Sequence, residues 1–416
     1  MRNSLGPTLR LPIAAVIIAI LVAVPAVGFA QEVQWSRQFG GRGPDRARAI
    51  AVNGSGVYVA GTTEGSLPGE RGEGTIDAFL RKYDSEGHEL WTRQFGTTEM
   101  DDVLAVAADE SGVYVAGGSQ GDLHGQSNTP VGAHAFVRKY DLHGAEVWTR
   151  EFGNGRSEEA RAVAVGATGV HVAGNTTATS PPYDDGFVTA FATGGESRWS
   201  RWIETVGVDR VSAIAVNASG VYVAGATRGG PPGPSGAGGV DGFLRRYDLD
   251  GHEAWTRQVE TAETGGMLSM TVDGTGLYLA GTTGGAIAGQ ARGGGRDAFA
   301  SKYDFDGRLL WSRQFGTSAD DRALGIAVHA QGVYIAGSTM GGLHGEVHAG
   351  DADGFVQRYD LNGVTAWTYQ FGSGQYDQAL GVAVDASGVY VAGATGGALP
   401  GHSNNGSFDA FVVKLR

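Results

Sequence analysis

The chain has 416 residues, enough for two or three ordinary domains, but its composition indicates an all-β protein with many tight turns. Glycine supplies 71 residues and proline only 12, and valine, threonine, tyrosine and tryptophan recur in short runs between glycines. The formal charge of -13 argues against nucleic acid or an anionic membrane surface as the main partner. Cysteine is absent, which excludes disulfides, thiolate metal sites and a cysteine nucleophile.

Residues 1–30 predict an export signal. Arg2 and Arg10 precede an apolar run over 11–30 that ends in small residues, as expected of a cleaved signal peptide. The run is also long enough to span a bilayer, so an uncleaved N-terminal anchor is the alternative. Both interpretations place the rest of the chain outside the cytoplasm, in the medium, on the cell surface or in the periplasm.

Seven tryptophans at spacings of 51 to 57 residues mark seven copies of one unit, which together fill residues 31–416. Each copy holds four runs of strand length separated by turns such as Asp385-Ala-Ser-Gly388, in which aspartate bonds the local backbone and glycine accepts a positive φ. Four short antiparallel strands form one blade, so the sequence predicts an all-β, seven-bladed β-propeller. The tryptophans are Trp35, Trp91, Trp148, Trp199, Trp255, Trp311 and Trp367.

The phase of the repeat predicts how the ring closes. The run Val33–Phe39 is a tryptophan strand without the three strands that precede it in other copies. The C-terminal run Asp409–Arg416 lacks the tryptophan strand that should follow it. We therefore expect the N-terminal strand to pair with the C-terminal one and complete the last blade, which removes two exposed sheet edges.

Two runs recur in the copies: Asp-Ala-Phe-x-x-Lys-Tyr-Asp-x-x-Gly-x-x-x-Trp-x-Arg-x-Phe-Gly, and Ala-Val-Asp-x-x-Gly-Val-Tyr-Val-Ala-Gly after it. Over about residues 33–416 this text resembles the seven-bladed β-propeller (SBBP) repeats of exported bacterial and archaeal proteins. The copy around Trp199 departs from it, because Phe187-Val-Thr-Ala-Phe-Ala-Thr-Gly194 replaces the usual Tyr-Asp turn and Trp202 is added. The resemblance implies the fold and export, and it carries over no catalytic residue. Quinoprotein propellers space their Asp, Gly and Trp residues differently, so no quinone cofactor is expected.

An acid stands ten residues after the tryptophan in six of the seven copies, at the start of the strand expected to be innermost. These acids could form a ring of oxygen ligands at the mouth of the central channel, which would suit Ca²⁺ or Mg²⁺. We favour a structural role, in which each carboxylate caps backbone donors or pairs with an arginine two residues after a tryptophan, because the feature recurs in nearly every copy. We therefore expect no cofactor, with Ca²⁺ as the alternative. The acids are Asp45, Asp101, Glu158, Asp209, Asp321 and Asp377.

The glycine-rich loops between the second and third strands are long and are expected to vary in length and composition, whereas the hairpin turns that leave the opposite face are short and nearly identical. Function tends to reside in variable loops on a rigid scaffold. No catalytic group stands out against its repeat equivalents; His171, for example, replaces a tyrosine and is expected to be a packed residue. We therefore expect an exported, non-enzymatic, monomeric scaffold that binds an envelope protein or glycan with this face.

The alternative function is a glycan-active hydrolase or lyase on the same face, because pairs of loop acids could supply general acid and base. Neither function involves nucleic acid, or a membrane beyond the N-terminal anchor. The candidate enzymatic residues are Asp184, Asp185, His344, Glu346 and Asp351.

Overall fold

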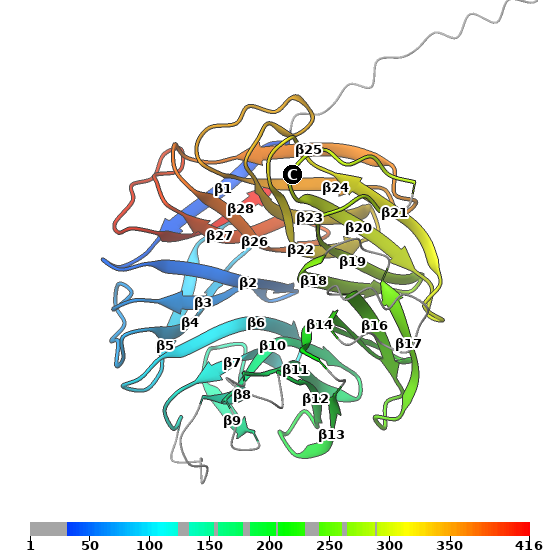
Figure 1. Cartoon of the computed structure of the whole chain (residues 1–416). Helices are drawn as coiled ribbons and strands as arrows, with labels where there is room; N and C mark the ends of the chain where they lie inside the picture. Colours follow the sequence, from blue (N-terminus) through cyan, green and yellow to red (C-terminus); the bar gives the residue numbers. More distant parts are fainter. Residues whose placement is uncertain are drawn as a thin grey trace, which may run out of the picture. The chain divides into compact units, whose positions relative to one another are not determined.

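The computed structural model describes residues 31–123, 133–153, 157–177, 184–204, 207–228, 241–259, 264–287 and 289–416. The expected export signal at 1–30 lies outside the described residues. The described chain forms strands β1 to β28 and one 3-10 turn, η1 (Leu343–Gly345), and every sheet has four strands (Figure 1). Within these ranges no helix has the length and apolarity needed to cross a bilayer.

The first four blades are continuous in sequence, and each runs from its inner to its outer strand. Blade 1 is β2 (Asp45–Asn53), β3 (Gly56–Thr63), β4 (Asp77–Tyr83) and β5 (Glu89–Phe95). Blade 2 is β6 (Asp101–Asp109), β7 (Gly112–Ser119), β8 (His134–Tyr140) and β9 (Glu146–Phe152). Blade 3 is β10 (Ser157–Gly166), β11 (Gly169–Thr177), β12 (Gly186–Phe191) and β13 (Ser197–Ile203). Blade 4 is β14 (Asp209–Asn217), β15 (Gly220–Thr227), β16 (Asp241–Tyr247) and β17 (Glu253–Val259).

The last three blades follow the same order, except that the final one takes its outer strand from the N-terminal part of the chain. Blade 5 is β18 (Thr264–Asp273), β19 (Gly276–Thr283), β20 (Asp297–Tyr303) and β21 (Leu309–Phe315). Blade 6 is β22 (Asp321–His329), β23 (Gly332–Thr339), β24 (Asp353–Tyr359) and β25 (Thr365–Phe371). Blade 7 is β26 (Asp377–Asp385), β27 (Gly388–Thr395), β28 (Asp409–Leu415) and β1 (Val33–Phe39).

The predicted closure of the ring is confirmed. Strand β1 pairs antiparallel with β28, in a register that runs from Val33 opposite Leu415 to Phe39 opposite Ala410. The inner strands pack in the circular order β2, β6, β10, β14, β18, β22 and β26, and β26 contacts β2 again. The described strands are therefore the all-β, seven-bladed propeller that the repeat predicts, with four antiparallel strands in each blade.

Apolar layers between neighbouring blades form the core. The second and third strands are buried on both faces, and Val57, Tyr58 and Val59 are all fully buried in β3. One hydrophobic cluster joins Val59 and Tyr83 of blade 1 to Tyr390 and Val412 of blade 7, and comparable clusters fill other junctions. Each blade therefore depends on its neighbours to bury both faces of its sheet.

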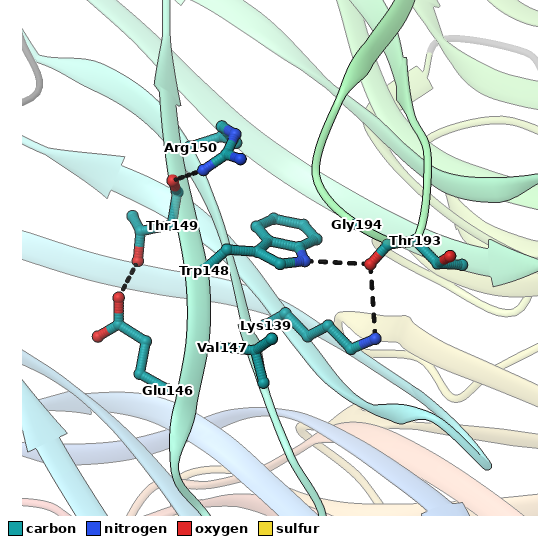
Figure 2. A pocket seen from close by; sticks show the side chains of 8 residues that line it. All are labelled: Lys139, Glu146, Val147, Trp148, Thr149, Arg150, Thr193 and Gly194. Atoms are coloured by element: carbon teal, nitrogen blue, oxygen red, sulfur yellow. Dashed lines mark hydrogen bonds between the residues drawn. The ribbon is translucent and has the colours of Figure 1, made fainter.

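Five outer-strand tryptophans of the described chain donate to the hairpin turn of the next blade, and Figure 2 shows the contact between blades 2 and 3. The indole Nε1 of Trp148 donates to the carbonyl of Thr193 at 3.1 Å, and Lys139 Nζ lies 3.5 Å from the same oxygen. Arg150 Nε donates to the carbonyl of Gly195 at 2.8 Å. Gly195 has φ +90°, and a Cβ on it would lie 2.9 Å from the indole, so the turn requires glycine on both counts.

The same contact recurs at other junctions between blades. Trp35, Trp91, Trp199 and Trp311 donate to the carbonyls of Ser85, Leu142, Leu249 and Leu361. Four of the six arginines that stand two residues after a tryptophan donate Nε to a turn carbonyl of the next blade: Arg93, Arg150, Arg201 and Arg313.

Deletion of residues 31–40 removes the outer strand of blade 7 and exposes the edge of β28. It also removes Trp35 and Phe39 from the core between blades 7 and 1. We expect severe destabilisation, with a melting temperature at least about 10 °C below that of the 31–416 chain, measured by circular dichroism. An unchanged melting temperature would contradict closure by the N-terminal strand.

Candidate functional site

The loops between second and third strands lie on one face, and buried residues anchor them to the blades. In blade 1, Leu67 is buried and its N–H donates to Gln94 Oε1 at 2.9 Å. Gln94 Nε2 in turn donates to the Gly65 carbonyl at 2.6 Å and to Asp77 Oδ2 at 2.8 Å. The outer strand therefore holds both the loop and the start of the third strand.

The same anchor recurs in blades 5, 6 and 7, where a glutamine of the outer strand accepts the N–H of a buried leucine or isoleucine. The loops 64–76, 284–296, 340–352 and 396–408 consequently have equal lengths, set by the strands that flank them. The variation expected from the sequence therefore lies in the exposed residues of these loops, while their anchors and lengths repeat. Only loop 178–185 of blade 3 is much shorter.

The six acids predicted as a ring do stand at the start of the inner strands, and all six side chains are buried. Asp321 shows the typical contacts: Oδ2 accepts the Thr317 N–H at 2.6 Å, and Oδ1 accepts the Thr339 hydroxyl at 2.5 Å. Asp101 and Asp377 accept the equivalent backbone N–H groups of Thr97 and Ser373. These carboxylates cap the connection that leads into the inner strand.

The backbone of the same residues joins neighbouring blades. The Asp45 N–H donates to the carbonyl of Phe408 in blade 7 at 2.8 Å, and the Asp101 N–H donates to Ile76 in blade 1 at 2.9 Å. Glu158, Asp209, Asp321 and Asp377 make the equivalent bonds to Ala133, Asp184, Arg296 and Ala352. Because carbonyls and N–H groups of adjacent blades meet here, these acids form part of the seam.

A second buried acid stands close to the first at several junctions. Asp409 Oδ1 and Asp45 Oδ2 lie within 2.7 Å of the position that a Cβ on Gly40 would occupy, so two carboxylates share one small space. Burial raises the pKa of Asp45 to about 6, and the charge of Asp409 adds to the effect. Burial likewise raises the pKa values of Asp321 and Asp377, with smaller contributions from Asp297 and Asp353.

No group of three or more histidine and acidic side chains in the described ranges has a geometry suited to a metal ion. In Asp101, Asp321 and Asp377, backbone and hydroxyl donors occupy the carboxylate oxygens. Cation binding by the six acids remains a prediction.

The five residues considered for glycan hydrolysis belong to two distant loops. Asp184 and Asp185 precede β12 of blade 3, where Asp184 forms an ion pair of 3.1 Å with Arg210 and Asp185 is buried. His344, Glu346 and Asp351 lie in loop 340–352 of blade 6 and are exposed. Blades 4 and 5 separate the two loops on one side of the ring, and blades 2, 1 and 7 on the other.

His171 is packed in the apolar seam, as the repeat suggests. It is buried, and its ring centroid lies 6.0 Å from that of Trp199. Its Nδ1 has no hydrogen-bond partner in the described chain, nor has the hydroxyl of nearby Thr168. In blade 2 the corresponding pair, Tyr114 and Ser111, shares a hydrogen bond of 2.9 Å. Burial lowers the pKa of His171 to about 4.

A groove of about 580 Å³ lies in the seam between blades 2 and 3. Its floor is aromatic, because Phe152 of blade 2 meets Phe187 and Phe191 of blade 3 with ring centroids 5.7 and 5.5 Å apart. Trp202 lines the groove and is 38% exposed. Glu158 and Glu196 also line it, together with the hydroxyls of Thr189, Ser197 and Ser200.

Trp202 stood out in the sequence as a departure from the repeat, but the groove was not predicted. Trp202 occupies the position of the loop-anchoring glutamine, and Thr189 occupies a position held by arginine in blades 1, 2 and 4. The two replacements reveal the groove only when the residues that face one seam are compared across all copies.

The inner strands enclose a cavity of about 310 Å³ along the axis of the ring. Its lining is mostly apolar, but Arg48 and Arg161 replace the leucine or serine of the other copies. Arg161 forms an ion pair with Glu159, whereas Nε of Arg48 is buried without a hydrogen-bond partner in the described chain. Burial lowers the pKa of Arg48. This pair of cations was also not predicted from the sequence.

The architecture defines a β-propeller, and comparison with solved structures supports the same fold. The WD40 domain of Neurospora crassa Pan2 superposes with a TM-score of 0.51 over 92% of this chain and 96% of that domain, at 11% identity. The WD40 β-propeller domain of Doa1 gives 0.52 over 93% and 97%, at 10% identity. At these identities the likeness concerns the fold alone.

Among curated proteins, the regulatory protein FlaEY of Caulobacter vibrioides is 28% identical over 407 residues. The match covers 82% of this chain and 41% of FlaEY, so the chain spans less than half of its relative. No protein-family model matches the chain. The likeness to SBBP repeats therefore remains a resemblance of the repeat text.

Asp45→Asn is expected to change the pH dependence of stability. The folded pKa of about 6 exceeds the value near 3.9 of an unfolded aspartate, so folding favours the protonated acid, and this stability is lost as pH rises from 4 through 6. Asparagine stays neutral throughout. The melting temperature of the variant minus that of the parent should therefore fall by a few degrees between pH 7.5 and pH 4.5. A constant difference would show that the carboxyl titrates normally.

His171→Tyr should stabilise the protein, because the tyrosine hydroxyl can bond Thr168 as its equivalents do, a gain of about 1 kcal/mol. The folded pKa of about 4 lies below the value near 6.5 of an unfolded histidine. The parent thus loses stability as pH falls from 6.5 towards 4, and the variant does not. The gain in melting temperature should be larger at pH 5 than at pH 7.5; a smaller gain at pH 5 would contradict the buried neutral imidazole.

Proposed function

We propose that this protein is an exported, non-enzymatic binding scaffold that recognises a protein or glycan of the cell envelope through the face carrying the loops between second and third strands. The observation that carries the proposal is the anchoring of these loops. Buried Leu67, Ile287, Leu343 and Leu399 and the outer-strand glutamines hold each loop in place while its remaining residues differ. A rigid frame with variable tips is the usual design of a recognition surface.

The opposite face offers much less variation. Its hairpin turns repeat the same aspartate caps: Asp141 accepts the N–H groups of His143 and Ala145, and Asp360 accepts those of Asn362 and Val364. Exposed apolar side chains occur on both faces, for example Leu90 and Val147 near the turns and Met340 and Val347 in the loops. The similarity to a protein described as regulatory is compatible with a binding role.

The enzymatic alternative has less support. Its five candidate residues lie on loops of blades 3 and 6, with two or more blades between them. A glycosidase requires two carboxyl groups on opposite sides of one scissile bond, in a single site. Asp184 is moreover engaged by Arg210.

A binding screen on the 31–416 chain, with purified envelope proteins and a glycan panel, tests the proposal. Blade 6 offers a matched pair of exposed valines: Val347 in the variable loop and Val364 in the opposite hairpin turn, 83% and 60% exposed. If blade 6 contributes to the contact, we expect Val347→Asp to lower the affinity for the partner roughly tenfold. We expect Val364→Asp to leave this affinity unchanged. The same exchange at Met340 extends the test along the loop face.

Loss of binding through Val364→Asp, with the loop variants unaffected, would place recognition on the other face and overturn the proposal. Turnover of a polysaccharide, abolished by Glu346→Gln, would replace the scaffold with the enzyme.

A further inference from the structure

Arginines of the third strand fill the seam with the preceding blade in part of the ring. The guanidinium carbon of Arg81 in blade 1 lies 4.0 Å from the ring centroid of Phe39 in blade 7. That of Arg138 in blade 2 lies 4.4 Å from the ring centroid of Phe95 in blade 1. Stacking of a cation on an aromatic face is favourable, and more so where water is excluded.

The same arginines have polar partners on the outer strand of their own blade. Arg81 Nε donates to Thr92 Oγ1 at 2.7 Å, and its Nη1 lies 3.3 Å from Glu89 Oε2. Arg138 repeats the arrangement with Thr149 and Glu146, at 2.7 and 3.5 Å. The protein therefore contains, in these seams, a complete receptor for a guanidinium group: an aromatic ring, a hydroxyl and a carboxylate.

Blade 3 retains the aromatic ring but lacks the arginine. Thr189 stands at the arginine position, opposite Ser200, and the two hydroxyls lie 3.0 Å apart. Ser197 replaces the glutamate that begins the outer strand in blades 1 and 2. Phe152 keeps the place of Phe39 and Phe95, so the removal of a long side chain leaves the groove above its ring.

The charges around the groove suit a cation. Glu158 and Glu196 line it, and Glu196 forms no ion pair within the described chain. The only basic residue in the lining is Arg150, whose Nε and Nη1 donate to the carbonyls of Gly195 and Thr149 at 2.8 and 2.7 Å. These two groups are thus directed to the backbone of the seam, and Glu196 is left for a ligand.

We propose that this groove binds an arginine side chain of a partner protein, with the guanidinium over Phe152 where Arg138 lies over Phe95. The hydroxyls of Thr189 and Ser200 take the role of Thr149, and Glu196 supplies the carboxylate. The aliphatic stem of the incoming side chain packs against the exposed ring of Trp202. This inference rests on the proposed binding function and selects a protein partner over a glycan.

The first test compares two capped tripeptides, acetyl-Gly-Arg-Gly-amide and the same peptide with citrulline, by titration calorimetry on the 31–416 chain. Citrulline has nearly the shape of arginine but no charge. We expect saturable binding of the arginine peptide, roughly tenfold weaker binding of the citrulline peptide, and a loss of affinity at high salt. Equal affinity for the two peptides, or no binding of either, overturns the inference.

The second test fills the groove from within. Thr189→Arg restores the residue of blades 1, 2 and 4, so we expect a higher melting temperature and at least tenfold weaker binding of the arginine peptide. The control is Ser301→Arg, the same exchange in blade 5, where Ser301 also faces a serine, Ser312. It should leave peptide binding unchanged. Should Thr189→Arg fail to fold, we expect Glu196→Gln to lower the affinity for the arginine peptide and to leave the affinity for the citrulline peptide unchanged.

The partner found in the envelope screen separates the two proposals. If Thr189→Arg abolishes peptide binding but leaves the partner bound through the loop face, the inference is overturned and the proposed function remains. If the peptide binds as expected but no envelope protein or glycan binds, the proposed function is the one that fails. Competition by a neutral oligosaccharide for the peptide site would also overturn the inference.

Discussion

The contact between an outer-strand tryptophan and the left-handed glycine of the next hairpin turn sets the geometry of the ring. The indole packs on a turn that cannot carry a side chain, donates to its carbonyl, and is accompanied by an arginine that binds a second carbonyl of the same turn. At the opposite face, the N–H of each inner-strand acid meets a carbonyl of the preceding blade. Two fixed contacts, one at each face, determine the angle between neighbouring blades.

A ring held at both faces tolerates changes in the middle of its loops, because the loop carbonyls that join neighbouring blades, such as those of Ile76 and Phe408, belong to the last residues of the loops. The anchor residues of the loops, such as Leu67 and Gln94, belong to the blade, and the residues between them do not. This explains why sequence varies along the loops while their length stays constant in most blades. Recognition by such a surface would depend on exposed tips rather than on a change of the frame.

The fold was predictable from the sequence because the repeat is long and each of its marker residues has a single structural reason. Tryptophan spacing counts the blades, and the unequal ends at Val33–Phe39 and Asp409–Leu415 predict the shared sheet. The burial of the six acids was harder to predict from the sequence. The carboxylates of Asp101 and Asp321 are buried against hydroxyl donors of the neighbouring strand, Ser119 and Thr339, which stand eighteen residues away in the chain. The equal loop lengths were missed because only the structure identifies the glutamine that closes each anchor.

The groove was hidden for a related physical reason. Its cause is the loss of an arginine at Thr189, and the consequence appears over Phe152, a residue of another blade that is itself unchanged in the repeat. Sequence comparison shows that a residue differs, but not which neighbour is thereby uncovered. The axial cations Arg48 and Arg161 are similar, because they become neighbours of one cavity only when the ring closes.

Blade 3 carries several departures from the repeat, and two of them weaken its packing. Thr189 leaves an open groove, His171 leaves Thr168 without a partner, and Trp202 replaces the loop-anchoring glutamine. An unfilled groove and an unpartnered buried polar group each cost on the order of 1 kcal/mol or more. All six other copies carry tyrosine at the His171 position, and three carry arginine at the Thr189 position, so better-packed alternatives were available to the same chain. Stability sacrificed repeatedly at one place is typical of sites where function opposes packing, so we regard the seam between blades 2 and 3 as the part of the ring shaped for a ligand.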